Sequence, residues 1–206
     1  MNKWQRINYQ PNIPLGLDGS KVTACPAHIE LSKNAAKEGM VLVKNMGKTL
    51  PLKKGCHVAL FGKASFDYVK GGGGSGDVTV SYTTNIYEGI KKLPEWISTN
   101  EELADFYRDH VKQGYNDERE PGLVSEPKLP EDLVKKARIN SDTAIISICR
   151  YSGEGWDRKS SKDQNEALAD RQVGKVAEHS IELFPDGDFY LSKNEKDMIS
   201  TVKRHF

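Results

Sequence analysis

Thr143-Ala-Ile-Ile-Ser-Ile-Cys149 is a short apolar run that predicts a buried β-strand. A second run, His57-Val-Ala-Leu-Phe61, is also continuously apolar and ends at Gly62. Runs of this kind are typical of strands that are covered on both faces in a parallel sheet. Segments of helical composition lie between the two runs and after them. The sequence therefore predicts an α/β domain with a largely parallel sheet.

Helices and turns can be placed around these two strands. The segment 114–130 is charged and contains Pro and Gly, so we expect a surface loop, and helical turns are expected within 167–181. Ser192 and Glu195 have the spacing of a capping box. Because the last helix ends where the chain ends, at Phe206, we expect the sheet to be incomplete in this chain. The predicted helices are 29–38, 85–93, 101–113, 130–139 and 192–205, with a short strand at 40–44.

Composition excludes several classes of protein. The chain has 206 residues, with 30 basic and 29 acidic side chains, and this balance favours neither nucleic acid nor anionic membranes as partners. The sequence has no apolar run that could span a bilayer and no signal-peptide core at its start. The three cysteines (Cys25, Cys56 and Cys149) are far apart, which argues against a disulfide framework or a zinc site. We therefore expect a cytoplasmic protein without a metal or cofactor. Residues 1–27, rich in Pro and Gly, predict an extended N-terminal arm.

A glycine-rich segment covers residues 70–77, Lys-Gly-Gly-Gly-Gly-Ser-Gly-Asp. Its spacing formally matches the dinucleotide fingerprint, but that motif needs a strand directly before it and a helix at its last glycine. Here eight residues separate Gly71, the first glycine of the segment, from Gly62, and a β-like stretch follows. A flexible surface loop is one interpretation. The other is a loop in which backbone N–H groups and the Ser75 hydroxyl closely approach a ligand.

The stretch Arg150-Tyr-Ser-Gly-Glu-Gly-Trp-Asp-Arg158 directly follows the strand predicted at 143–149. Its glutamate, Glu154, lies between two glycines on a loop, which suits a mobile general acid or base. Trp156 is a loop aromatic of the kind that stacks on sugar rings. The alternative interpretation is that Glu154 is a solvated charge without a chemical role.

Taken together, several patches resemble the six-stranded α/β sandwich domain of glycoside hydrolase family 3. The resemblance implies a retaining β-glycosidase, most simply a β-glucosidase, acting on terminal non-reducing β-D-glucosyl residues of a β-glucoside or oligosaccharide. In that family a glutamate on the sandwich domain is the acid/base, and Glu154 matches it. Ser75, flanked by Gly74 and Gly76, matches a serine that reaches the sugar, and Trp156 would form a wall of the leaving-group subsite. The patches are residues 35–45, 49–52, 58–62, 71–77, 150–158 and 187–192.

The chain also departs from the common family pattern. The sandwich begins near residue 28 and is predicted to extend over 28–206, as in members that carry the sandwich before the barrel. Residues 159–186 form a polar insertion. No residues resemble the (β/α)₈ barrel that carries the nucleophilic aspartate, so the chain alone is expected to be inactive and to need the barrel and the rest of the sandwich. A non-catalytic carbohydrate-binding or scaffold module and a nucleotide-binding α/β domain are the alternatives, and homo-oligomer formation is left open.

Overall fold

The computed structural model describes residues 24–71, 80, 82–150 and 174–206, with side chains from residue 178 onward in the last range. The predicted site residues Gly74, Ser75, Gly76, Glu154 and Trp156 lie outside this part of the chain. The chain divides into two compact units, Met1–Pro51 and Leu52–Phe206. Within the described ranges, no helix has the length and apolar character needed to cross a membrane.

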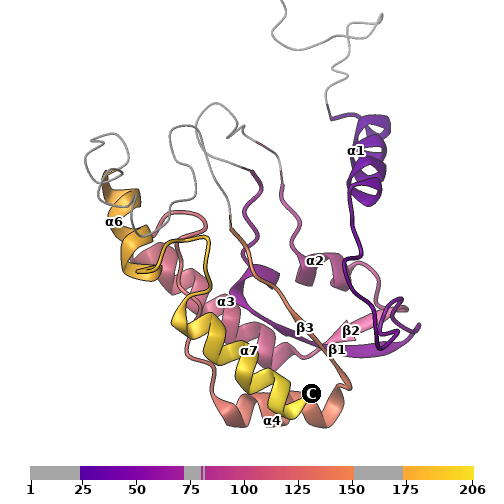
Figure 1. Cartoon of the computed structure of the whole chain (residues 1–206). Helices are drawn as coiled ribbons and strands as arrows, with labels where there is room; N and C mark the ends of the chain where they lie inside the picture. The colour runs from indigo at the N-terminus through magenta and orange to yellow at the C-terminus, as the bar shows by residue number, and fades with distance from the viewer. Residues whose placement is uncertain (1–23, 72–79, 81, 151–173) are drawn as a thin grey trace, which may run out of the picture. The chain divides into compact units, whose positions relative to one another are not determined.

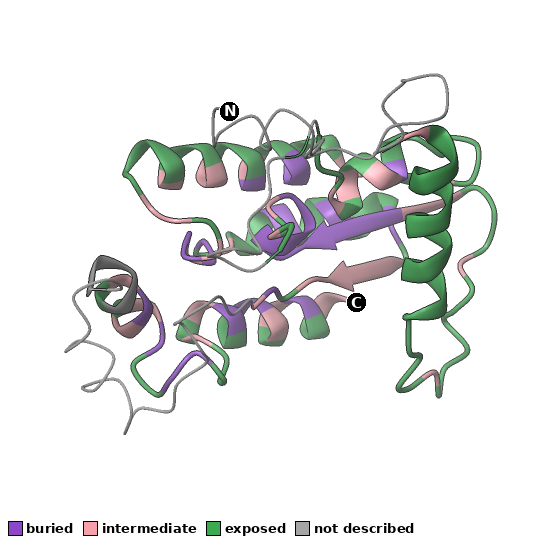
Figure 2. Ribbon diagram, turned by 90° about the horizontal axis from the view of Figure 1, so that it is seen from above, coloured by how far each residue is buried: buried purple, intermediate pink, exposed green. Residues whose placement is uncertain are grey.

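The described part of the first unit, residues 24–51, contains one helix, α1 (Pro26–Glu38), in which no residue is buried (Figures 1 and 2). It begins three residues before the predicted start because Pro26 is tolerated in the first helical turn, and it ends at Gly39 as predicted. The strand expected at 40–44 is wrong. These residues pair with no strand among the described residues, and a β-strand needs such a hydrogen-bonded partner.

The second unit is built on a parallel sheet of three strands in the order β2-β1-β3 (Figure 1). The strands are β1 (Cys56–Phe61), β2 (Ile97–Thr99) and β3 (Thr143–Ile146). The central strand pairs with both neighbours, so Val58 lies opposite Thr99 on one side and Thr143 on the other. This sheet confirms the predicted α/β class. The three-residue strand β2 was not predicted, because so short a segment carries no periodicity.

Helices connect and flank these strands. The predictions for α2, α3, α4 and α7 are confirmed within a few residues at each end, and Pro130 precedes α4 as its N-cap. The capping box at Ser192 and Glu195 is present at the start of α7. The helical turns expected within 167–181 correspond in part to α6. The elements are η2 (Lys63–Ser65), α2 (Ile86–Lys91), α3 (Glu101–Asn116), α4 (Glu131–Asn140), α6 (Gly174–Leu183) and α7 (Lys193–His205).

The core of the second unit surrounds β1, whose residues 58–61 are almost completely buried between helices (Figure 2). Helix α3 contacts β1 and η2, while α4 contacts β1 and α7. The Phe66 ring stacks on Tyr107 of α3, with centroids 5.3 Å apart. Because β1 is covered on both faces, its continuous apolar sequence is explained by burial rather than by alternation. Large side chains that are also fully buried include Leu103, Tyr107, Val134, Met198 and Val202.

The segment that follows α3 corrects a prediction. Residues 114–130 were expected to form a surface loop, yet α3 continues to Asn116, and Leu123, Val124 and Glu126 are buried. Close packing at Gly114 permits this, since a Cβ there would lie 2.7 Å from a methyl carbon of Val124. The segment therefore folds back over the second unit and brings a carboxyl group inside it.

Candidate functional site

The described residues bring the starts of both predicted loops to one edge of the sheet. The glycine-rich loop follows β1 and η2, and the Glu154 loop follows β3. These strands are parallel neighbours, with Phe61 opposite Ile146, and the Ser147 N–H donates to the Phe61 carbonyl at 2.9 Å. Ligands of open α/β sheets bind outside the carboxyl ends of the strands. The strands that precede the two loops are thus neighbours, and both end at the edge where such folds place their sites.

Gly62 and Ser65 hold the strands together at this edge. Gly62 has φ +88°, and a Cβ added to it would lie 2.2 Å from the carbonyl oxygen of Ser147. Just beyond it, the Ser65 hydroxyl donates to the Ser147 hydroxyl at 2.9 Å. The backbones of the two loop-bearing segments are therefore in direct contact before the loops begin.

A buried ion pair fixes the chain between Gly62 and the glycine-rich loop. Lys63 Nζ lies 3.2 Å from Asp67 Oδ2, and both side chains are about nine-tenths buried. The Tyr115 hydroxyl donates to the other oxygen of Asp67 at 2.6 Å. These contacts tie the segment after β1 to the end of α3, so the chain leads into the glycine-rich loop from a fixed origin.

Glu126 is a buried carboxyl group behind the same edge, 6% exposed. Its Oε2 accepts the Lys63 N–H at 2.9 Å, and its Oε1 has no hydrogen-bond partner among the residues that the structure describes. Burial raises the pKa of Glu126 to about 7, against the lowering influence of the Lys63 amide and the Tyr107 hydroxyl. Glu126 is therefore protonated in the folded chain under mildly acidic conditions.

This shift predicts a pH-dependent stability. As pH rises from about 4.5 to about 7, the unfolded chain loses the Glu126 proton while the folded chain retains it. The stabilisation that protonated Glu126 contributes is fully present below pH 4.5 and is lost as pH rises through 7. The free energy of unfolding should therefore fall by about 3 kcal/mol over this range. Glutamine does not titrate, so we expect the free energy of unfolding of Glu126→Gln to lack this decrease between pH 4.5 and 7. Urea unfolding at several pH values measures it. Exposed Glu95→Gln is the control, and parallel profiles for wild type and Glu126→Gln would contradict the prediction.

Arg150 fixes the segment that leads from the end of β3, at Ile146, into the Glu154 loop. Its guanidinium forms a bidentate ion pair with Glu195 of α7 at 2.7 and 2.6 Å, and both side chains are almost fully buried. Burial alone raises the pKa of Glu195, but the Arg150 hydrogen bonds and charge and the Ser192 N–H hold that pKa below its ordinary value. The carboxylate is therefore ionised, and the pair is charged on both sides.

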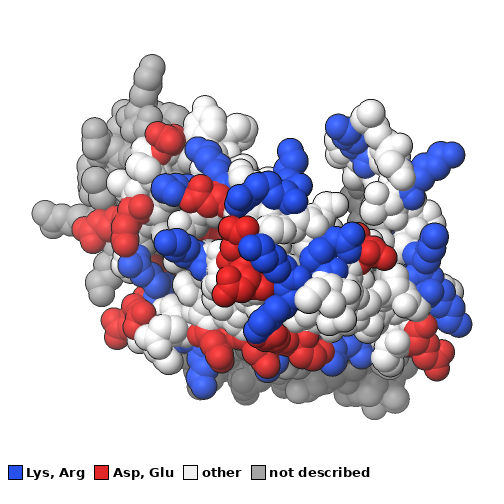
Figure 3. Space-filling model, turned by 90° about the horizontal axis from the view of Figure 1, so that it is seen from below, with Lys and Arg blue, Asp and Glu red and all other residues white. Residues whose placement is uncertain are grey.

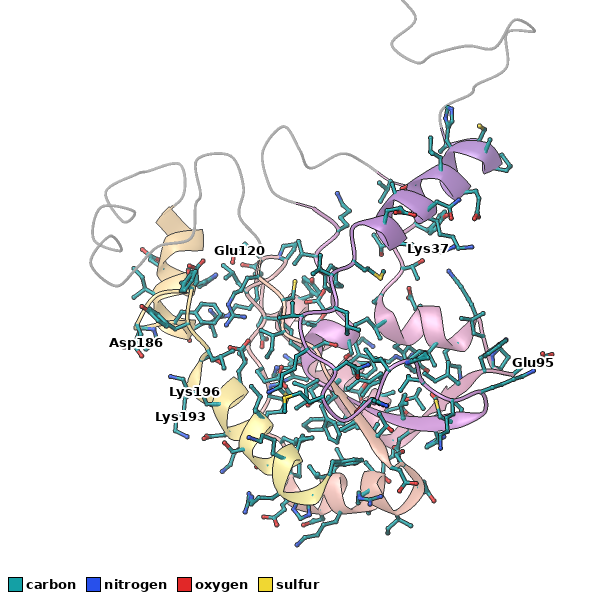
Figure 4. All side chains as sticks on the ribbon, turned by 45° about the vertical axis from the view of Figure 1, so that its right-hand side comes forward. Lys37, Glu95, Glu120, Asp186, Lys193 and Lys196 are labelled. Atoms are coloured by element: carbon teal, nitrogen blue, oxygen red, sulfur yellow. The ribbon has the colours of Figure 1, made fainter. Side chains whose placement is uncertain are left out.

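The first turn of α7 contacts both Arg150, before the Glu154 loop, and the segment that carries Glu126. While Glu195 binds Arg150, the amide of Asn194 donates to the Glu126 backbone carbonyl at 2.8 Å. Lys193 and Lys196, labelled in Figure 4, point outward on the opposite side of the helix. One face of α7 thus contacts the segments behind both loops, and the other face is solvated.

The sequence did not predict this polar cluster. The one feature of the sequence that pointed to this cluster was the capping box, because it placed Glu195 at the start of a helix. No group of His, Cys, Asp and Glu in the described ranges could hold a metal ion. Acidic and basic side chains are intermingled on the face shown in Figure 3. That face therefore presents no patch of a single charge to attract an ionic ligand.

A cavity of about 220 Å³ lies between the end of α3, the segment after it and α6. Its charged side chains have partners: Arg119 forms a bidentate pair with Glu182, and Gln113 donates to Asp117. The His110 ring lies 2.8 Å from the Ser125 carbonyl. The cavity therefore offers few free polar groups for binding a ligand.

Comparison with protein families identifies the domain. A family model described as the glycosyl hydrolase family 3 C-terminal domain matches residues 40–205. Beta-glucosidase A of Butyrivibrio fibrisolvens is 50% identical over 206 residues, which cover all of this chain and 25% of that protein. A beta-glucosidase of Ruminococcus albus is 36% identical over 136 residues, 63% of this chain and 14% of that protein.

Solved structures are similar over most of the chain. Beta-glucosidase 3B of Thermotoga neapolitana in complex with α-D-glucose matches with a TM-score of 0.67 and 34% identity, covering 91% of this chain and 23% of that one. A beta-glucosidase of Paenibacillus barengoltzii matches with a TM-score of 0.68 and 30% identity, covering 88% and 18%. The chain spans about a quarter of the length of the first of these relatives.

Proposed function

The chain belongs to glycosyl hydrolase family 3, and from this premise we propose that it is one part of a retaining, exo-acting β-glucosidase. The observation that carries the proposal is the 50% identity to a beta-glucosidase along the whole chain. Because the chain spans a quarter of that relative, the activity is proposed for a larger polypeptide that contains it. The proposed substrate is a β-glucoside or oligosaccharide with a terminal β-D-glucosyl residue.

Within that enzyme we propose Glu154 as the acid/base. Retaining hydrolysis uses two carboxyl groups about 5–5.5 Å apart, one attacking the sugar and one protonating the leaving oxygen. Glu154 would give its proton to the leaving oxygen and then, as a carboxylate, remove a proton from the attacking water. The nucleophile would come from the barrel, which we propose follows the sandwich in the polypeptide. Support for the role comes from the glycine-flanked motif and from its origin at the carboxyl end of β3.

The glycine-rich loop is proposed to hold the sugar. Ser75, with Gly74 and Gly76 beside it, would offer its hydroxyl and neighbouring N–H groups to the terminal glucosyl residue. Trp156 would stack on the leaving group. Supporting this, the loop leaves the sheet beside the Glu154 loop, after a segment fixed by the Lys63–Asp67 ion pair.

A direct experiment tests the proposed activity. We expect the complete enzyme to hydrolyse an aryl β-glucoside and to release β-glucose first, which NMR during the first turnovers detects. The 206-residue chain alone should show no hydrolysis above the buffer control, because it would supply only one of the two carboxyl groups. Release of α-glucose first would contradict retention, and hydrolysis by the chain alone would contradict the division of the site.

The role of Glu154 is tested by Glu154→Gln in the complete enzyme. Unchanged hydrolysis of a natural β-glucoside by this variant would contradict the acid/base assignment. The chain would then be a carbohydrate-binding or scaffold part of the enzyme, with the glycine-rich loop and Trp156 as its contacts.

A further inference from the structure

Arg150 uses every hydrogen-bond donor of its guanidinium. Two N–H groups bind the Glu195 carboxylate, and the remaining three donate to backbone carbonyls of Asp188, Tyr190 and Cys149 at 2.9, 3.1 and 2.9 Å. An arginine has five such donors in a rigid planar arrangement. Because all five donors have acceptors, the guanidinium is held in a single orientation.

The contacts of Arg150 come from separate parts of the chain. Besides the Cys149 carbonyl, they include the turn at 184–191 and the first turn of α7. The guanidinium also lies over the Phe184 ring, 4.2 Å from its centroid. These segments are themselves anchored, since Phe184 is buried and α7 packs into the core through Met198 and Val202. Arg150 thus ties the segment that follows β3 to a rigid support.

Glu195 is held equally firmly. The Ser192 N–H donates to Glu195 Oε2 at 2.7 Å, and the Glu195 N–H donates back to the Ser192 hydroxyl. The carboxylate therefore has a fixed position before Arg150 binds it. An ion pair between two preset groups fixes geometry better than one between two flexible surface side chains.

Stability alone does not explain such a pair. Both charges lose their hydration, and well-packed apolar side chains in place of a buried ion pair often leave a protein equally or more stable. What the pair does supply is a unique geometry at the last described residue before the Glu154 loop. Glu154 follows Arg150 by four residues in the sequence.

We propose that Arg150, held by Glu195, is a positioning residue that fixes the origin of the Glu154 loop and thereby aims the acid/base at the leaving oxygen. This inference rests on the proposed function. A general acid must lie within hydrogen-bond reach of the proton acceptor, and small displacements of such groups carry large losses in rate. A loop whose origin is free to move would place Glu154 correctly for a smaller fraction of the time.

The test is Arg150→Met in the complete enzyme, with Glu154 intact. Protonation matters most for poor leaving groups, so we compare kcat/KM for an alkyl β-glucoside and for 2,4-dinitrophenyl β-glucoside. The expected loss is roughly 10- to 100-fold for the alkyl substrate and less than about threefold for the dinitrophenyl substrate. An equal loss for both would indicate general damage to the fold and overturn the proposal.

Two further variants keep the test valid if Arg150→Met does not fold. Arg150→Lys retains the charge but cannot make the bidentate pair, and Glu195→Gln retains the capping box while losing the carboxylate. Both should show the same dependence on the leaving group, with smaller losses. Full activity toward the alkyl substrate in both variants would overturn the proposal.

The matched control is Arg138→Met, at the opposite end of β3. Arg138 donates to the Ser141 carbonyl and to Asp142, and its guanidinium lies over the Phe206 ring, 5.5 Å from the centroid. It therefore makes the same kinds of contact as Arg150, away from the loops. We expect its kcat/KM to remain the same as wild type with either substrate. A loss confined to the alkyl substrate in Arg138→Met would overturn the proposal.

A double variant separates this inference from the proposed function. If Arg150 acts through Glu154, Arg150→Met should cause little further loss toward the alkyl substrate in a Glu154→Gln background. A multiplicative loss in the double variant would overturn the positioning role while leaving the acid/base role in place. No effect of Glu154→Gln by itself would instead refute the proposed function.

Discussion

Glu154→Gln in the complete enzyme should reduce kcat/KM for an alkyl β-glucoside by roughly 10²- to 10⁴-fold, the usual contribution of a general acid or base. Glutamine has nearly the same shape but no proton to give, so the alkoxide leaving group would depart unprotonated. For 2,4-dinitrophenyl β-glucoside, kcat/KM should change little, because that leaving group needs no protonation. Its kcat should still fall, since water attacking the glycosyl-enzyme would lack a base.

Azide provides the specific diagnostic. As an anion it attacks the glycosyl-enzyme without losing a proton, so it should restore kcat of Glu154→Gln toward the dinitrophenyl substrate and yield β-glucosyl azide. The control is Glu95→Gln, because Glu95 is exposed and points away from the rest of the chain (Figure 4). Wild-type hydrolysis of the alkyl glucoside by Glu154→Gln, or the absence of azide rescue, would contradict the acid/base role.

The parts of the fold that sequence could predict are those determined by local chemistry. A continuous apolar run predicts β1 because a strand covered on both faces has no polar face to show. The spacing of Ser192 and Glu195 predicts the start of α7 because the capping box is made within one turn. In both cases the residues that decide the structure lie within a few positions of each other.

The failures have a different physical origin. The apolar residues 40–44 resemble a strand, but a strand exists only where a second one accepts its hydrogen bonds. Leu123 and Val124 are buried in a segment of loop-like composition because Gly114 lets them approach α3. Each of these outcomes depends on a partner elsewhere in the chain.

The candidate site also has a part that the sequence predicts and a part that depends on distant partners. Its motifs, the glycine-rich loop and the Glu154 loop, are local patterns and could be predicted from sequence. The groups behind them could not, since Arg150 meets Glu195 across 45 residues and Lys63 meets Glu126 across 63. Only the parallel pairing of β1 with β3 and the packing of α7 bring these side chains to one edge.

Gly62→Ala should be among the most destabilising substitutions in the chain. The φ of +88° disfavours any side chain, at a cost of about 1–2 kcal/mol. The new Cβ would also lie 2.2 Å from the Ser147 carbonyl oxygen, and overpacking of this kind costs about 1–3 kcal/mol or more. The Ser147 backbone cannot move aside without breaking its hydrogen bond to Phe61. We therefore expect a loss of roughly 2–5 kcal/mol in the free energy of unfolding, a large part of the stability of a domain.

Gly55→Ala separates the two causes. Gly55 also has a positive φ, +78°, but a Cβ there would have no atom within 4 Å. It should therefore show the backbone cost alone, about 1–2 kcal/mol. Urea unfolding of both variants gives the comparison, and equal losses would show that the contact with Ser147 contributes nothing.

Since Gly62 lies where the two loop-bearing strands meet, a partly folded Gly62→Ala variant of the complete enzyme should also lose activity toward alkyl and dinitrophenyl substrates alike. That result would distinguish damage to the sheet edge from loss of the acid/base, which affects the alkyl substrate far more.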